Sequence, residues 1–291
     1  MLGLLTNVSN KNRRWPARGW AGLILVAICW PLNWILPGAR TAFLFFPLWL
    51  GYILTADAAV QARTGSSLWL RSRKHFVSLF AVSAMVWWLF ELINLRTSNW
   101  EYLGRERFAP LEFGLLATIS FSTVIPAVFE TAAVISTFAW MDLFASGPRI
   151  PVRRAAFLFL LLIGLATFST ILIWPKIFYP FTWISLFCVF EPINYWNGRP
   201  FLLKQLRTGD WRTVISLSLG ALACGFFWEM WNYYSFPKWI YHIPGPAFLR
   251  IFEMPLLGYV GYIPFGLELY ALTNFALPRK TSPGTAGPRW L

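Results

Sequence analysis

The chain has 291 residues, of which 57% are hydrophobic, 19% aromatic and only 13% charged. This composition excludes an ordinary soluble globular domain, which does not need so much apolar surface. The net charge of +13 comes with no nucleic-acid recognition motif, so the sequence predicts no nucleic-acid partner.

Apolar runs of about twenty residues recur along the whole chain, and each is long enough to cross a bilayer as a helix. They predict an all-α integral membrane protein, because a helix satisfies its backbone amides within its own segment. Eight transmembrane helices are expected, at about 18–36, 42–60, 75–95, 113–139, 155–174, 179–196, 212–234 and 250–276.

The basic residues predict how these helices are oriented. Of the 25 Lys and Arg residues, the eight-helix arrangement puts 18 on the side that holds both termini. The other side has the remaining seven, which are Arg40, Arg96, Arg105, Arg107, Lys176, Lys238 and Arg250. The positive-inside rule therefore places both termini in the cytoplasm, facing the headgroups of membrane lipids. This asymmetry favours a bacterial-type inner membrane.

The two halves of the chain resemble each other at an offset near 138 residues. Glu91, Asn94, Trp100 and Tyr102 of the first half match Glu229, Asn232, Trp239 and Tyr241 of the second. The Pro126 and Glu130 pair likewise matches Pro264 and Glu268. The repeat predicts two parallel four-helix units related by a pseudo-two-fold axis along the membrane normal.

This organisation divides the chain into five segments. Two of them are the four-helix repeats, at 18–140 and 155–276, and a cytoplasmic linker at 141–154 joins them. A basic cytoplasmic N-terminus at 1–17 precedes the repeats. A Pro- and Gly-rich tail at 277–291 follows them and is expected to be disordered in the cytoplasm.

Eight of the twelve acidic residues fall within or beside the expected spans, where a carboxylate costs about 2.5 kcal/mol or more. Glu91, Glu112, Glu229 and Glu253 are expected toward the non-cytoplasmic ends, and Asp57, Glu130, Glu191 and Glu268 toward the cytoplasmic ends. For most of them a structural role is open, as interfacial or helix-end groups. Glu130 and Glu268 each follow a proline by four residues, so they could instead satisfy backbone groups freed by a kink.

The Glu-x-x-Asn spacing puts each glutamate and its asparagine on one helix face. We therefore expect Asn94 to orient Glu91 and Asn232 to orient Glu229. Two buried carboxyls facing each other across a pseudo-dyad can serve as a proton donor and a proton acceptor. The pattern predicts Glu91 and Glu229 as the acid and the base of a reaction, in either order.

Aromatic residues cluster around both glutamates, and aromatic faces can stabilise a cationic intermediate. The residues expected to line a substrate pocket are Trp87, Trp88, Trp228, Trp231, Trp239 and Tyr241. An interfacial aromatic belt is the alternative for Trp239 and Tyr241. The chain has two histidines, which are expected on opposite membrane sides, no Asp-rich cluster and no nucleotide-binding motif. The sequence thus predicts neither a metal site nor a cofactor.

The second half offers Trp228 and Glu229, then Trp239 and Tyr241, then Gly258, Gly261, Pro264 and Glu268. In this order of residues the chain resembles the small membrane-embedded lycopene cyclases of carotenoid synthesis. The resemblance implies proton-initiated cyclisation of an isoprenoid without redox change. It carries over Glu229 and Glu268, with Glu91 and Glu130 as first-half equivalents. The chain departs from the family in having Glu after Trp and a single Glu after Pro.

Three functions stay open at this point. The first is a cofactor-independent cyclase- or isomerase-like enzyme that acts on an apolar isoprenoid or lipid. The second is a proton-coupled transporter or channel, for which internal repeats and intramembrane carboxylates are typical. The third is a non-catalytic membrane assembly or lipid-binding protein. The residues leave the oligomeric state open as well.

Overall fold

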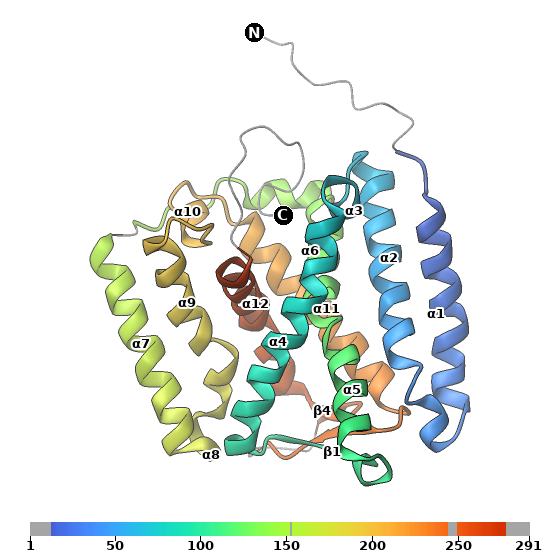
Figure 1. Ribbon diagram of the computed structural model, residues 1–291. Coiled ribbons are helices and arrows are strands. Elements are labelled where there is room, and N and C mark those ends of the chain that lie inside the picture. The colour runs from blue at the N-terminus through green and yellow to red at the C-terminus, as the bar shows by residue number, and fades with distance from the viewer. Residues whose placement is uncertain (1–12, 152, 244–248, 278–291) are drawn as a thin grey trace.

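The computed structural model describes residues 13–151, 153–243 and 249–277, so most of the expected basic N-terminus and tail lies outside the described residues. Long helices run side by side between the two ends of the molecule (Figure 1). These are α1 (Ala17–Ile35), α2 (Phe45–Thr64), α4 (Arg73–Thr97), α5 (Pro110–Phe121), α6 (Val124–Ser136), α7 (Arg154–Ile173), α9 (Ser185–Trp196), α11 (Arg212–Asn232) and α12 (Tyr262–Ala276).

Six helical segments of the described chain are long and apolar enough to cross a membrane. They are Ala17–Ile35, Gly38–Thr64, Arg73–Thr97, Pro110–Ser136, Arg154–Ile173 and Arg212–Asn232. The expectation of a mainly helical, multi-pass integral membrane protein is confirmed. The other two expected spans contain α9 and α12, whose 12 and 15 residues fall short of the roughly 20 that a full crossing needs.

Short elements connect the long helices. They include the helices α3 (Leu68–Arg71), α8 (Pro175–Phe178) and α10 (Leu203–Leu206). Within the described residues, 3-10 helices have the bounds Gly38–Thr41, Arg105–Arg107, Ala139–Phe144, Tyr179–Trp183 and Leu256–Gly261. Ser67 and Ser72 start α3 and α4 by accepting the Leu70 and His75 N–H groups at 3.3 and 3.2 Å.

Helix α1 packs closely on α2 because two glycines meet there. An added Cβ on Gly22 would lie 2.6 Å from the Gly51 carbonyl oxygen, and one on Gly51 would lie 2.8 Å from the Gly22 carbonyl oxygen. Larger side chains at either position would push the helices apart. Small residues at helix contacts are typical of membrane proteins.

Two small antiparallel sheets accompany the helices in the described chain. Strand β1 (Trp100–Leu103) follows α4 and pairs with β2 (Lys238–Tyr241), which follows α11, so that Trp100 lies opposite Tyr241 and Tyr102 opposite Trp239. Strands β3 (Arg250–Ile251) and β4 (Met254–Pro255) form the second pair. Both sheets lie at the end of the molecule opposite α3 and α10.

Three of the expected spans are not continuous α-helices, and in one of them, 179–196, α9 begins only at Ser185. The segment 113–139 is broken between α5 and α6, and 250–276 becomes α-helical only at Tyr262. As a result Pro126 and Pro264 lie in the first turns of α6 and α12. First-turn N–H groups have no intrahelical partner in any case, so these prolines free no carbonyl through a kink. The kink interpretation of Glu130 and Glu268 is therefore wrong.

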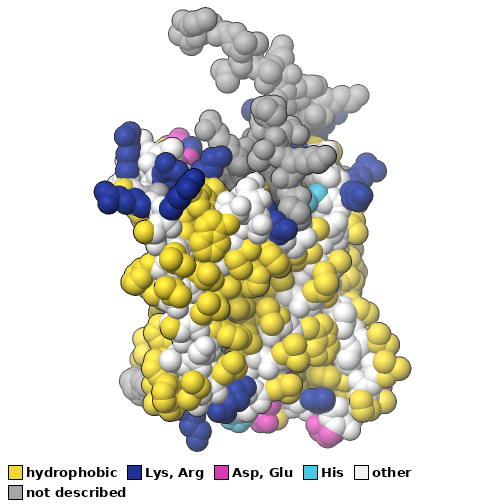
Figure 2. All heavy atoms as spheres, turned by 60° about the vertical axis from the view of Figure 1, so that its left-hand side comes forward, with side chains coloured by type: hydrophobic (Ala, Val, Ile, Leu, Met, Phe, Trp, Pro, Cys, Tyr) yellow, Lys and Arg dark blue, Asp and Glu magenta, His cyan; other side chains and the backbone are white. Residues whose placement is uncertain are grey.

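The charged side chains gather at the two ends, with a broad apolar surface between them (Figure 2). On the face shown, Lys and Arg cluster at the upper end of the molecule. The opposite end shows fewer Lys and Arg together with Asp, Glu and His. An apolar band between two charged rims fits a protein surrounded by lipid.

Candidate functional site

Glu91, near the end of α4, accepts three hydrogen bonds on one carboxyl oxygen. The indole N–H of Trp87 donates from one turn earlier in α4, at 3.1 Å. The indole N–H of Trp100 and the hydroxyl of Tyr102 donate from β1 at 3.1 and 2.6 Å. Because all three donors are aromatic, an ionisable group sits at the centre of an otherwise apolar cluster.

Glu229, near the end of α11, is completely buried and is held in a similar way. Its Oε1 accepts the hydroxyl groups of Tyr241 at 2.6 Å and Tyr262 at 2.8 Å. The Trp239 indole donates to the Tyr241 oxygen at 2.8 Å and so extends the network. Within the described chain, the second oxygen of Glu229 is buried without a hydrogen bond.

The two asparagines do not orient the glutamates, contrary to the expectation from their spacing. The amide of Asn94 donates to the Trp100 carbonyl at 2.8 Å, and its oxygen accepts the Trp100 and Asn99 N–H groups. Asn232 binds the Trp239 carbonyl at 2.7 Å and the Trp239 N–H at 2.9 Å. Each asparagine therefore fixes the strand whose aromatic residues bind the glutamate, so its action on the carboxyl is indirect.

We expect Asn232→Ala to lower the free energy of unfolding by about 1–3 kcal/mol, because it leaves the Trp239 N–H and carbonyl without their side-chain partner. Asn197→Ala is the matched control, since Asn197 is exposed at the end of α9. Thermal unfolding of both purified variants in the same detergent checks this. Equal melting temperatures would contradict the positioning role of Asn232.

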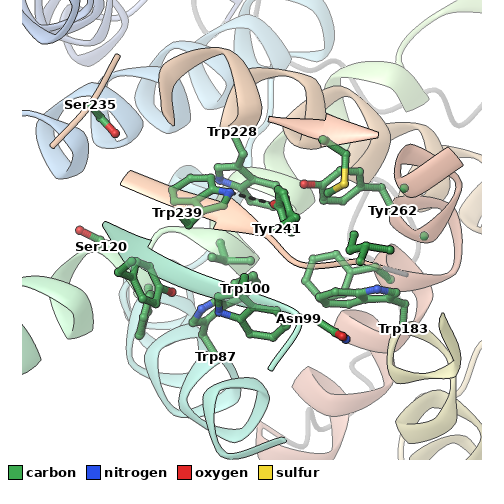
Figure 3. A pocket seen from close by; sticks show the side chains of 18 of the residues that line it. Trp87, Asn99, Trp100, Ser120, Trp183, Trp228, Ser235, Trp239, Tyr241 and Tyr262 are labelled. Carbon is green, nitrogen blue, oxygen red and sulfur yellow. Dashed lines mark hydrogen bonds between the residues drawn. The ribbon is translucent and has the colours of Figure 1, made fainter. Parts of the chain in front are cut away.

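An apolar cavity of about 520 Å³ lies between the two glutamate networks, close to the paired strands (Figure 3). Its wall includes Trp87, Trp100, Tyr102, Phe113, Phe121, Trp183, Trp228, Trp239, Tyr241, Tyr262 and Phe265. Glu91 and Glu229 are not part of that wall, but five of their hydrogen-bond donors are. Each carboxyl is thus connected to the cavity by a hydrogen bond from an aromatic O–H or N–H group in the wall.

The cavity gathers four of the six aromatic residues that the sequence singled out. Trp87, Trp228, Trp239 and Tyr241 line it. Trp88 lies outside, is 38% exposed and donates to Thr118 at 3.0 Å. Trp231 is buried on the far side of α11, where it packs on the rings of Trp49 and Tyr52. Neighbours along a helix point in different directions, so only part of each aromatic run can face one cavity.

The two strand tyrosines are built to stay protonated. Burial raises the pKa of the Tyr102 phenol well above its ordinary value, and the Glu91 charge raises it further. Burial and then the Glu229 charge do the same to the pKa of Tyr241. Both hydroxyls are therefore protonated near neutral pH and donate hydrogen bonds to the carboxyls.

The hydrogen-bond networks of Glu91 and Glu229 differ in one donor. The offset that relates Glu91 to Glu229 also relates Trp87 to Gly225 and Val124 to Tyr262. In the second network Tyr262 occupies the space that Gly225 leaves open, because a Cβ on Gly225 would lie 2.3 Å from the Tyr262 ring. A phenol from α12 thus takes the place of the indole that Trp87 supplies to Glu91.

We expect Gly225→Ala to displace the Tyr262 ring and to lower the free energy of unfolding by about 1–3 kcal/mol, because the ring is packed against Trp228 and Phe265. Gly114→Ala is the control, since a Cβ there meets no atom within 4 Å. Thermal unfolding measures both. A Gly225→Ala protein as stable as the Gly114→Ala protein would show that the close approach carries no energetic consequence.

The remaining predicted carboxyls lie away from the cavity. Glu268 is fully buried in α12 and accepts the Leu186 N–H at the start of α9, at 2.8 Å. Glu130 is fully buried in α6, with the Asp57 carboxyl and the Arg71 guanidinium as charged neighbours. Neither side chain appears in the cavity wall. In the described chain, the four predicted catalytic glutamates therefore form one pair beside the cavity and two separate sites elsewhere.

Asp57 and Glu191 each bind the start of a short helix. Asp57 accepts the Trp69 N–H of α3 at 3.0 Å and pairs with Arg18 at 2.5 Å. Glu191 accepts the Leu203 N–H of α10 at 2.7 Å. A carboxylate suits the N-terminus of a helix, where backbone N–H groups lack partners.

Glu112 and Glu253 lie at the outer rim and do not line the cavity. Glu112 accepts the Ala109 N–H at the start of α5, and Glu253 pairs with Lys238. Both have the structural role that the sequence left open for them. The outer carboxyls therefore divide into two that join aromatic networks and two that stabilise loops.

Sequence reasoning missed Tyr262, Asn99 and Trp183, all of which line the cavity. The repeat could not identify Tyr262, because its counterpart Val124 is apolar. Trp183 stacks between Trp100 and Phe90, with ring centroids 6.1 and 5.6 Å away. It precedes α9 in a segment expected to be part of a continuous span, so nothing in the pattern set it apart.

Among residues 13–151, 153–243 and 249–277, no three His, Cys, Asp or Glu side chains lie close enough together to hold a metal ion. No family model matches the chain, and neither a curated protein nor a solved structure matches it.

Proposed function

We propose that this protein is a membrane enzyme that acts on an apolar isoprenoid or lipid by acid/base chemistry, in the manner of a cyclase or isomerase. One observation carries the proposal. Two carboxyls from distant parts of the chain approach a single aromatic cavity, each through hydroxyl or indole donors that line the wall. A volume of about 520 Å³ suits a small-molecule ligand, for which pockets of about 300–1,000 Å³ are usual.

The proposed reaction adds one proton to the substrate and removes another, so no electrons are gained or lost. The Glu229 carboxyl protonates a carbon–carbon double bond through a neighbouring phenol, which passes its own proton to the substrate as it takes up the proton of the carboxyl. The aromatic walls then stabilise the resulting carbocation. Loss of a proton from a neighbouring carbon, through Tyr102 to Glu91, forms the new double bond.

Differences in hydrogen bonding support this order of roles. Glu91 accepts three donors on one oxygen, which suits an ionised carboxylate acting as the base. The second oxygen of Glu229 is buried without a donor in the described chain, a position that disfavours a charged oxygen. Glu229 is accordingly proposed as the acid.

The finer architecture belongs to the same proposal. It has eight spans in two parallel four-helix repeats, with both termini in the cytoplasm of a bacterial-type inner membrane. The matched contacts of Glu91 with Glu229 and of Asp57 with Glu191 support the repeat. The 3-10 turns before α9 and α12 lengthen these helices to Tyr179–Trp196 and Leu256–Ala276, which supports two further crossings.

The resemblance to the small lycopene cyclases supports the choice of an isoprenoid. The proposed site agrees with it at Glu229 and at the aromatic residues Trp228, Trp239 and Tyr241. Glu268 and Glu130, which the resemblance also carries over, have structural roles in this proposal because they lie away from the cavity.

A proton-coupled transporter is the second candidate, and a specific observation favours it. Glu130 is fully buried in α6 with the Asp57 carboxyl as a neighbour, and it does not line the cavity. Carboxyls at two depths could pass protons across the membrane. Proton flux in proteoliposomes that Glu130→Gln abolishes and Glu229→Gln leaves unchanged would favour this function over the enzyme.

The proposal is tested by expressing the wild type and the Glu91→Gln/Glu229→Gln variant in a lycopene-producing host, at matched levels of folded protein. Mass spectrometry of apolar extracts compares the two. The proposal predicts an isoprenoid isomer that only the wild type forms. Identical extracts would exclude lycopene as the substrate and would favour transport or lipid binding over an enzymatic function.

A further inference from the structure

The cavity wall contains one deeply buried amide among its aromatic residues. Asn99 is only 4% exposed and precedes Trp100 at the start of β1. Its side-chain amide makes no hydrogen bond to any other residue that the structure describes, although it lines the cavity. The amide lines the cavity, so its donors and its acceptor are available to a ligand.

The other deeply buried polar groups of the wall have partners. The Thr41 hydroxyl donates to the Gly38 and Phe236 carbonyls at 3.2 Å. The Ser235 hydroxyl donates to the Asn232 carbonyl at 3.0 Å. Ser120 is less buried and lies on the other side of the cavity in Figure 3. Asn99 is therefore the wall residue best placed to bind a polar atom inside the cavity.

The backbone on both sides of this amide is fixed. The Asn99 N–H donates to the Asn94 side chain at 2.9 Å, and the Asn99 carbonyl accepts the His242 N–H at 2.7 Å. Next to it the Trp100 and Trp183 rings stack on each other, and Figure 3 shows Asn99 beside both. The amide is thus presented from a rigid frame, which lowers the entropic cost of binding.

The position of Asn99 also indicates that the polar end of a ligand would lie toward the aqueous rim. Two residues further along the chain, Glu101 pairs with His242, and their side chains are 55% and 52% exposed at the outer end of the molecule. Asn99 therefore lies at the end of the cavity nearest the aqueous rim. An amphiphilic lipid places its polar end at this depth and its hydrocarbon deeper in the bilayer.

We infer that Asn99 binds the oxygen of a hydroxyl or carbonyl group at one end of an otherwise apolar isoprenoid. This inference rests on the proposed function, because it assumes that the cavity holds the substrate. It predicts that isoprenoids with one oxygen-bearing terminus bind more tightly than pure hydrocarbons, which lack a partner for the amide. A site built to bind a hydroxyl discriminates against the analogue that lacks it.

The test compares geranylgeraniol with the hydrocarbon of the same skeleton that lacks its hydroxyl. Both are titrated into the protein in lipid nanodiscs, with tryptophan fluorescence as the readout. One neutral hydrogen bond predicts that the wild type binds the alcohol about 3- to 10-fold more tightly. Asn99→Leu is expected to bring that ratio to about one by weakening alcohol binding alone, while Asn197→Leu, at an exposed position outside the cavity wall, keeps the wild-type ratio.

The possible outcomes distinguish the role of Asn99 from the proposed function. Equal binding of both probes by the wild type, or an unchanged preference in Asn99→Leu, would overturn the role of Asn99 and leave the proposed function standing. Binding of neither probe would overturn both. Should Asn99→Leu fail to fold, Asn99→Ala removes the same amide with less added bulk, and the same ratio decides.

Discussion

Glu229→Gln is expected to lower turnover of the isoprenoid by about 10²–10⁴-fold, because it removes a positioned acid that acts through Tyr241 and Tyr262. The amide keeps the size of the carboxyl and can still accept both phenol hydrogens. The fold should therefore persist while proton transfer is lost. Product formation per folded protein, measured by mass spectrometry of membranes supplied with lycopene, gives the ratio.

The control for this substitution is Glu112→Gln. Glu112 also lies at the outer end of the molecule, but it is exposed and binds only the Ala109 N–H at the start of α5. It should change turnover by less than about two-fold, as expected of a surface substitution. If Glu229→Gln retained activity comparable to Glu112→Gln, Glu229 would not be the acid.

Asp57→Ala is expected to cost about 3–5 kcal/mol of stability, because it leaves a largely buried guanidinium without its counter-ion. Arg18 binds Asp57 at 2.5 Å, and their side chains are 16% and 0% exposed. Asp57 also accepts the Ser67 hydroxyl at 3.0 Å. The variant should unfold at a clearly lower temperature in detergent and be recovered in smaller amounts from membranes.

Asp210→Ala provides the comparison. Asp210 pairs with Arg212 at 2.7 Å, but these side chains are 22% and 38% exposed, so the loss should cost only about 0–1 kcal/mol. The difference between the variants therefore measures burial rather than the mere presence of an ion pair. A similar loss of stability in both would mean that Arg18 finds solvent once Asp57 is removed.

The duplicated pattern located the glutamates well. Glu91 and Glu229 recur with Trp-x-Tyr at similar spacing, and the structure brings the two Trp-x-Tyr segments together as the paired strands β1 and β2. The spacing of Glu91 and Asn94 predicted that they share one helix face. It did not predict which groups their side chains bind. The asparagine side chains bind strand backbone, which a sequence pattern cannot distinguish from binding a neighbouring carboxyl.

The features that the sequence did not predict have physical reasons. Hydropathy measures how apolar a segment is and not whether it forms one continuous helix. It therefore did not predict the break between α5 and α6 or the late start of α12 at Tyr262. Tyr262 joins the Glu229 network across space, with no signal in its own segment. Asn99 carried no signal in the sequence, because its burial depends on contacts with the second half.

The most direct test of acid/base chemistry is the mass of the product formed in heavy water. Membranes containing the protein are incubated with lycopene in D₂O, and the product is isolated. A reaction that adds one proton from the enzyme and removes another from the substrate predicts an isomer carrying one deuterium and otherwise unchanged in composition. A product that carries no deuterium, or whose hydrogen content shows oxidation or reduction, would contradict the account.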